Sequence, residues 1–170
     1  MGGASGRGMK RAAIFGMLTA AVVACSPQPA AQATPTTSET TATHPVTGLR
    51  IVPLKVTTAA GKTYDFKVEM ADTPAAQARG LMFRTELGPF EGMIFPSVPP
   101  APRSFWMKNT PLPLDIIFVG TDGRILNIEP GVPYELQPVG SYDRATSGVL
   151  ELASGRSAEL GIKPGDKVAW

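Results

Sequence analysis

The chain has one cysteine, Cys25, and one histidine, His44, and both precede the segment that we expect to fold, which begins near residue 48. Catalysis by Ser-His-Asp or Cys-His groups, and zinc sites with histidine or thiolate ligands, are therefore excluded from that segment. A single cysteine forms no intramolecular disulfide, so the core must be held together by packing. The chemistry left to the folded part is that of carboxylates, Lys, Arg, Tyr and the backbone, and we expect no cofactor and no metal.

The folded segment also lacks an excess of charge of either sign. The formal net charge of the chain is +2, but Arg7, Lys10 and Arg11 contribute three of its 16 basic residues. From Gly48 onward the sequence has 13 basic and 13 acidic residues. Binding to nucleic acid requires a basic surface, which this balance does not provide. We therefore expect no nucleic-acid partner, and we expect a monomer.

Residues 1–24 have the features of a secretory signal peptide. Lys10 and Arg11 form its basic start, and residues 12–23 form an apolar run that is too short to span a bilayer. The run ends in Val-Val-Ala-Cys, which resembles a bacterial lipobox, in which the cysteine is acylated and becomes the mature N-terminus. We predict that Cys25 is lipidated; the alternative is an ordinary cleaved signal with an incidental cysteine.

Residues 25–47 are predicted to be a disordered tether behind the lipidated cysteine. They are rich in Thr, Pro, Ala and Gln, carry the single charge of Glu39, and have too few large apolar side chains to order themselves. A coil of this length spans roughly 25 to 30 Å. The N-terminal features together predict a protein of the bacterial cell envelope that faces the periplasm, attached to a membrane by its lipid. Ser26 after the cysteine resembles the pattern for export to the outer membrane.

Residues 48–170 are predicted to form one β domain. Residues 63–70 alternate strictly between apolar and polar side chains, and with residues 52–57 they predict a hairpin with one solvated face. A short helix is predicted from Pro74 onward, capped by Asp72 or Thr73. Further strands are predicted at 93–95, 105–108, 114–119, 124–128, 148–152 and 167–170, and one helical turn at 157–160. Short strands separated by Gly and Pro are typical of a sandwich or a barrel.

The stretch from Phe105 to Val119 is the densest in aromatic and branched apolar residues, and it is the one around which the domain is organised. Residues 114–119 are bounded by Pro113 and Gly120, which favours a buried strand over a helix. Residues 105–108 are predicted to be its partner strand. Period-two alternation places Ile116 and Phe118 on one face of the buried strand, and Asp115 with two β-branched residues on the other.

Four runs of the sequence carry a resemblance to a known family: GLMFR (80–84), GMIF (92–95), FWMKNTPLPLDIIF (105–118) and LELASG (150–155). In this order and spacing they resemble the domain of unknown function 192 family, over about residues 48–170. The resemblance implies a small all-β fold, a mainly antiparallel jelly-roll-like sandwich with one or two short helices. It implies no established activity.

Polar residues set among the apolar ones of this region predict a small binding pocket with apolar walls. Arg103 is a further candidate there, and Phe83 and Phe105 are candidate walls. Glu151 alternates with two leucines and is predicted to face solvent or a loop. The candidate binding residues are Arg84, Trp106, Lys108, Asn109 and Asp115.

A purely structural interpretation of the same residues stays open. In it Asp115 is a partly buried carboxylate that pairs with Lys108 or Arg84, Asn109 caps a turn, and Trp106 belongs to the core.

Two classes of function remain. One is a non-catalytic envelope module that binds a small molecule, a glycan or a protein partner. The other is a hydrolase of envelope polymer, which would need two carboxylates about 5 to 10 Å apart in a groove. We favour binding, because a domain without histidine or cysteine lacks the most versatile catalytic groups, whereas a tethered β domain needs neither to bind.

Overall fold

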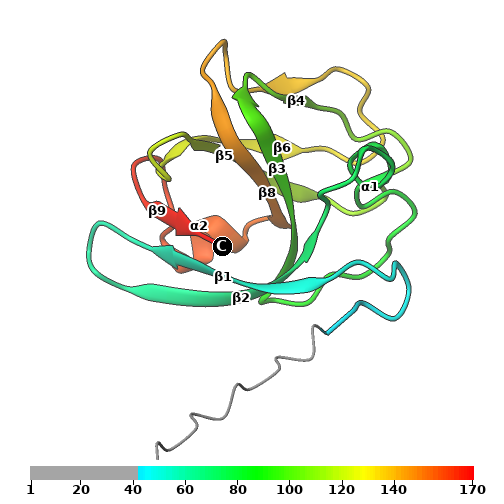
Figure 1. Ribbon diagram of the computed structural model, residues 1–170, viewed down its shortest axis with the longest axis horizontal. Helices are drawn as coiled ribbons and strands as arrows, with labels where there is room; N and C mark the ends of the chain where they lie inside the picture. The colour runs from blue at the N-terminus through cyan, green and yellow to red at the C-terminus, as the bar shows by residue number, and fades with distance from the viewer. Residues whose placement is uncertain (1–41) are drawn as a thin grey trace, which may run out of the picture. The chain divides into compact units, whose positions relative to one another are not determined.

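The structure, a computed structural model, describes residues 42–170 (Figure 1). The predicted signal peptide, Cys25 and most of the predicted tether lie outside the described residues. No helix within residues 42–170 is long and apolar enough to cross a membrane. The described part forms β1 (Ile51–Thr57), β2 (Thr63–Met70), α1 (Pro74–Arg79), β3 (Glu91–Ala101), β4 (Ser104–Phe105), β5 (Leu114–Gly120), β6 (Ile125–Gly131), β7 (Val139–Gly140), β8 (Thr146–Ala153), α2 (Arg156–Leu160) and β9 (Lys167–Ala169).

Seven of these strands form one sheet in the order β6-β5-β8-β3-β2-β1-β9, and β4 pairs with β7 in a separate ribbon. Only β2 and β3 run parallel; the other pairs of the sheet are antiparallel. The sheet curls so far that Arg124, next to β6 at one edge, forms an isolated bridge with Lys167 of β9 at the other. The prediction of an all-β, mainly antiparallel fold with two short helices is confirmed.

The central strands β3, β5 and β8 are buried on both faces, which gives the domain two apolar cores. The inner core lies within the curl of the sheet and receives side chains from all seven strands, such as Ile117 and Leu150. The outer core lies between the other face and the segments that cover it, and contains Ile116 and Phe118. The predicted alternation along β5 is therefore confirmed, and both of its faces are covered.

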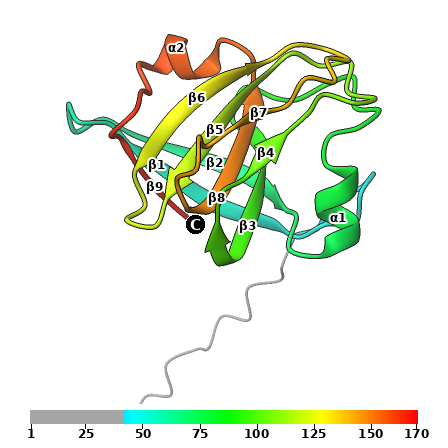
Figure 2. The same ribbon diagram turned by 90° about the horizontal axis from the view of Figure 1, so that it is seen from above.

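The first helix covers part of the outer core. Thr73 caps it by accepting a hydrogen bond from the Ala76 amide at 3.2 Å, and Pro74 occupies its first turn, as predicted. Gln77 fixes the helix to β3 by donating from Nε2 to the Pro96 carbonyl at 2.9 Å. Figure 2 shows that α1 and α2 lie at different ends of the molecule, so α2 takes no part in this cover.

The prediction that residues 105–108 pair with residues 114–119 is wrong. Phe105 belongs to β4, which pairs with Val139 and Gly140 of β7. The physical reason is that both edges of β5 are already hydrogen-bonded, one to β6 and the other to β8. The segment that contains Trp106 instead crosses over the outer core.

The predicted tether, residues 25–47, includes a segment that belongs to the folded part. Residues 42–47 pack against the domain. Glu69 is buried and accepts hydrogen bonds from Thr47 and from Arg84. The His44 ring lies 3.8 Å from the same carboxylate. A buried carboxylate needs such partners, so this segment is held to the sheet and the folded part contains a histidine after all.

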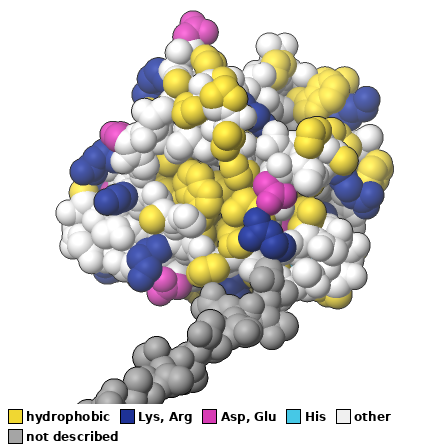
Figure 3. Space-filling view, in the orientation of Figure 1, with side chains coloured by type: hydrophobic (Ala, Val, Ile, Leu, Met, Phe, Trp, Pro, Cys, Tyr) yellow, Lys and Arg dark blue, Asp and Glu magenta, His cyan; other side chains and the backbone are white. Residues whose placement is uncertain are grey.

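Charged side chains are mixed over the face seen in Figure 3, where basic and acidic groups are interspersed instead of forming a patch of one sign. Two exposed ion pairs illustrate the mixing: Arg50 with Asp72 at 2.9 Å and Lys55 with Asp65 at 3.4 Å. Such pairs contribute little to stability.

Candidate functional site

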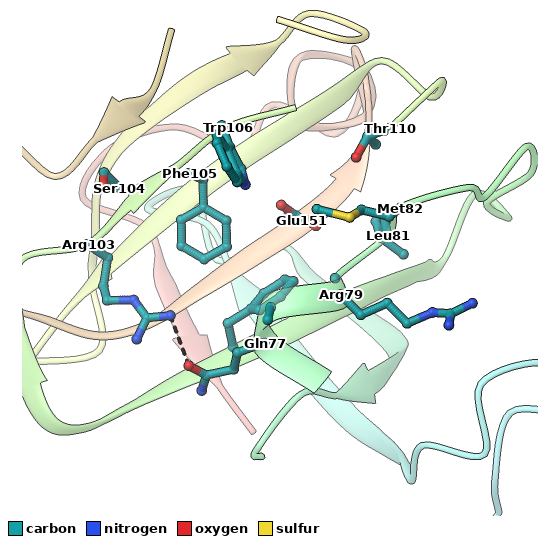
Figure 4. Close-up of a pocket in the computed structure, with 13 residues that line it drawn as sticks. Gln77, Arg79, Leu81, Met82, Arg103, Ser104, Phe105, Trp106, Thr110 and Glu151 are labelled. Carbon is teal, nitrogen blue, oxygen red and sulfur yellow. Dashed lines mark hydrogen bonds between the residues drawn. The ribbon is translucent and has the colours of Figure 1, made fainter. Parts of the chain in front are cut away.

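A cavity of about 220 Å³ opens on the outer core, between α1 and the segment that carries β4. One wall comes from α1 and the residues that follow it, and the opposite wall from residues 103–106, as Figure 4 shows. Phe95 of β3, Thr110 and Glu151 of β8 also line the cavity. Elements distant in sequence thus meet at this cavity.

Glu151 is the unusual group in this cavity. Its neighbours across the sheet are Met93 on β3 and Ile116 on β5, and the residue is only 4% exposed. No residue of the described chain forms a hydrogen bond or an ion pair with its carboxyl group. Burial among apolar side chains raises the pKa of Glu151 from 4.5 to about 8, because the charged form is poorly solvated there. At neutral pH the group is therefore mainly the uncharged acid.

The backbone around Glu151 is closely packed. A Cβ atom on Gly92 of β3 would lie 2.5 Å from the Glu151 carbonyl oxygen and 2.8 Å from Leu152 Cδ2. Only glycine lets β3 approach β8 this closely. β3 and β8 are therefore in close backbone contact beside Glu151.

Two further carboxylates lie in the same row of the sheet as Glu151, each two strands away. Glu129 of β6 is opposite Ile116, and Glu69 of β2 is opposite Met93. Glu129 accepts hydrogen bonds from Asn127 and Tyr142, and Glu69 pairs with Arg84 at 2.6 Å. Neither carboxylate lines the cavity, so Glu151 is its only acidic group.

The aromatic wall consists of Phe105 and Trp106. The Phe105 ring packs edge-on against Phe95 at 5.0 Å between centroids, and Trp106 is half exposed at the opening. A cationic side chain of the same protein already lies over each ring. The Arg103 guanidinium lies 5.6 Å from the Phe105 centroid, and the Lys108 ammonium lies 5.1 Å from the Trp106 ring.

Three loops around this region are joined through backbone groups. The Phe83 amide donates to the Asn109 carbonyl, and the Tyr134 amide donates to the Thr110 carbonyl. Phe83, Asn109 and Tyr134 all have positive φ, between 55° and 64°, a backbone conformation that residues other than glycine rarely adopt. Strained backbone of this kind is concentrated at functional sites.

The five predicted binding residues do not form one cluster. Trp106 lines the cavity, and Lys108 lies over its ring. Asn109 holds the turn beside them, with its side-chain amide 4.0 Å from the Met82 sulfur. Arg84 lines a separate hollow, where it is bound to Glu69.

Asp115 lies elsewhere, and its predicted pairing with Lys108 or Arg84 is wrong. Its two carboxylate oxygens accept hydrogen bonds from the backbone amides of Gly155 at 2.9 Å and Ser157 at 2.8 Å. These amides belong to the start of α2, which has no side-chain cap of its own. Asp115 thus caps α2 from the neighbouring strand.

Glu151 is the residue whose role the sequence did not reveal. Of its two predicted surroundings, solvent is wrong because the residue is buried, and the side chain instead faces the cavity that the segment of residues 103–110 lines. Its alternation with Leu150 and Leu152 correctly separates the two faces of β8. The error lies in assigning one face to solvent, since β8 is central and covered on both sides. The signal in the sequence is the nearly continuous apolar run of β5, because such runs are typical of strands that are covered on both faces. β8 pairs with β5 and so lies in the same covered part of the sheet.

No group of three or more His, Cys, Asp or Glu side chains that could hold a metal ion occurs within residues 42–170.

The described residues form a curled β domain with a small, aromatic-walled cavity. Its residues 55–170 match the model of the domain of unknown function 192 (DUF192) family, described as uncharacterized ACR. The chain belongs to that family.

The solved structures similar to this chain include the following two. A protein of unknown function from Novosphingobium aromaticivorans is 55% identical, with a TM-score of 0.72, and the match covers 76% of this chain and 91% of that one. A candidate transcription regulator from Sinorhizobium meliloti is 38% identical, with a TM-score of 0.68, over 71% of this chain and 94% of that one. No curated protein matches the chain.

Proposed function

We propose that this domain is a non-catalytic binding module that takes a small molecule into the cavity beside Glu151, on a protein anchored in the bacterial envelope through Cys25. The observation that carries the proposal is the Glu151 carboxyl group, which is buried at the cavity without a partner from the described chain. A buried polar group is costly unless it is satisfied, and a ligand can supply the missing hydrogen bond. The apolar walls would supply most of the contact area.

The alternative of a carboxylate-dependent hydrolase has less support. That chemistry needs two carboxylates on either side of the bond to be cleaved. Glu151 is the only acidic residue that lines the cavity. Glu69 and Glu129 lie two strands away and are bound to other groups of the chain. Binding without catalysis is therefore the better explanation.

A role in transcription, suggested by the description of the Sinorhizobium meliloti protein, also has little support in this chain. From Gly48 onward the basic and acidic residues are equal in number. A DNA-binding surface would need an excess of Lys and Arg on one face. A predicted signal peptide and lipid anchor also favour the envelope.

A retention experiment tests the proposal. Protein is incubated with an extract of envelope metabolites, separated from unbound material, and the retained molecules are identified by mass spectrometry. Ala78→Trp is the blocking variant, because Ala78 is exposed on α1 and lines the cavity. Ala75→Trp is the matched control, because Ala75 lies on the same helix but lines a different hollow. We expect molecules that the wild type and Ala75→Trp retain and Ala78→Trp does not; identical profiles would contradict the proposal.

A further inference from the structure

The cavity combines three features that constrain the chemistry of its occupant: a single carboxyl group inside, aromatic rings along one wall, and cationic side chains at the opening. Figure 4 shows the Glu151 carboxyl between the aromatic wall and Met82. Arg79 and Arg103 are the charged residues that line the cavity besides Glu151. The following steps rest on the proposed function, since they ask what kind of molecule the cavity would bind.

An organic cation is the first candidate, because aromatic rings and a carboxylate together bind ammonium groups. Two contacts count against it. Arg103 lies over Phe105 and Lys108 lies over Trp106, so the two rings already interact with cations of the chain. A second cation would approach like charges at the opening, where repulsion is costly.

The state of the carboxyl group also disfavours a cation. Burial raises the pKa of Glu151 to about 8, so binding an ammonium group at neutral pH would first require loss of the proton. The uncharged acid, in contrast, has an O–H that can donate and a carbonyl oxygen that can accept. The group that suits it best is a ligand oxygen that accepts its hydrogen bond.

Arg103 is the group at the opening that can hold a negative charge. Its guanidinium donates to Gln77 Oε1 at 3.1 Å, which fixes its orientation on the Phe105 ring. A guanidinium has five N–H donors, and this is its one hydrogen bond within the described chain. Arg79 also lines the opening but extends away from the cavity in Figure 4.

We infer that the cavity binds a small organic anion, whose apolar body packs on Phe105 and Trp106, whose charge lies near Arg103, and whose oxygen accepts a hydrogen bond from the Glu151 carboxyl group. The class includes small aromatic and aliphatic carboxylates. Other charged groups near this site are Arg79 on α1, Lys108 over Trp106, and the flanking carboxylates Glu69 on β2 and Glu129 on β6.

Three probes of similar shape and different charge test the inference on the full chain: phenylacetate, phenylacetamide and phenethylammonium. Isothermal titration calorimetry at pH 7 should show phenylacetate binding at least tenfold more tightly than phenethylammonium, with phenylacetamide between them. The affinity for phenylacetate should be constant up to about pH 8. Above that pH it should fall about tenfold per pH unit, as Glu151 loses its proton.

Variants separate the two contacts. Glu151→Gln keeps a neutral donor and acceptor but does not titrate, so it should still bind phenylacetamide and should lose the pH dependence. Arg103→Gln should weaken the binding of phenylacetate about tenfold and the binding of phenylacetamide less than twofold. Arg50→Gln is the matched control, because Arg50 pairs with Asp72 and does not line the cavity, so it should change both affinities less than twofold.

Tighter binding of phenethylammonium, an affinity that rises with pH, or no binding of any probe would overturn the inference. Its failure can be told apart from failure of the proposed function. If the retention experiment finds molecules that Ala78→Trp excludes and these are cations, the binding function stands and the ligand class is wrong. If that experiment finds none, the binding function itself is wrong.

Discussion

Glu151 shows how a single residue can set the pH response of a domain. A carboxyl group that is charged in the unfolded chain and uncharged in the folded one couples folding to proton uptake. The folded state raises the pKa of Glu151 from 4.5 to about 8 through burial. Between these pH values the folded protein holds a proton that the unfolded chain has released, so the contribution of Glu151 to the stability falls as the pH rises.

Glu151→Gln should remove this part of the pH dependence. In the wild type, the contribution of Glu151 to the free energy of unfolding is complete below about pH 4.5 and is lost by about pH 8. Between these values it falls by roughly 1 kcal/mol per pH unit, as expected for one titrating group. Urea unfolding at pH 5, 6.5 and 8 gives the slope for each protein. Relative to wild type, the variant should gain stability steadily as the pH rises over this range.

Glu86→Gln is the control, because Glu86 is exposed and its charge is solvated in both states. Its profile should follow that of the wild type. Parallel profiles for the wild type and Glu151→Gln would show instead that Glu151 is charged in the folded protein.

The sequence could predict some single residues and not others, and the difference has a physical cause. Thr73 was predictable as a cap because capping depends on residues within one turn of the helix. The partners of Asp115 were not, since they lie 40 and 42 positions further along the chain. The burial of Glu151 depends on β3 and β5, which a local pattern does not identify.

At the scale of elements, α2 depends on a strand for its stability. It has five residues, begins after a glycine, and has no side-chain cap of its own. A helix this short is not stable alone, because few of its backbone groups are paired within it. Asp115 on β5 supplies the acceptors for two of its first amides.

Asp115→Ala should therefore destabilise the protein by about 1 to 3 kcal/mol, since two amides lose their acceptor. Asp115→Asn should cost less, because one side-chain oxygen remains. Chemical denaturation measures both changes. Asp65→Ala, which removes an exposed carboxylate on β2, should change the stability by less than about 0.5 kcal/mol.

The same measurement distinguishes this cap from an ion pair with Lys108. If Asp115 were paired with Lys108, removing both charges would recover part of the loss. Because the partners are backbone amides, Asp115→Ala combined with Lys108→Ala should lose at least as much stability as Asp115→Ala alone. Recovery in the double variant would count against the cap.

Elements differ in how well their neighbours can be predicted. The hairpin of β1 and β2 was predictable because its strands are close in sequence and alternate clearly. The pairing of β4 with β7 joins residues more than 30 positions apart, and each strand has only two residues. Short strands carry too little pattern to specify a distant partner, so the partner of residue 105 was assigned wrongly to β5.

At the scale of the whole molecule, the sequence assigns attachment and binding to separate parts. The predicted attachment point, Cys25, lies outside the described residues, whereas the cavity is built from residues 77–151. Residues 42–47 are held to the sheet through Glu69, so the predicted tether is shorter than the sequence indicated. This arrangement predicts that the two functions can be removed independently.

Cys25→Ser tests the separation. If Cys25 is acylated, the lipid supplies the membrane affinity, at about 0.8 kcal/mol per buried CH₂ group. Loss of acylation should then move the protein from the membrane fraction to the soluble fraction of lysed cells, as immunoblotting after ultracentrifugation would show. Ser38→Ala, a change within the predicted tether, should leave the protein with the membrane.

The soluble Cys25→Ser protein should retain the same molecules as the wild type in the retention experiment, because the cavity-lining residues are unchanged. Membrane association that persists in Cys25→Ser would contradict the lipid anchor, and lost retention in a folded, soluble variant would contradict the independence of the two parts.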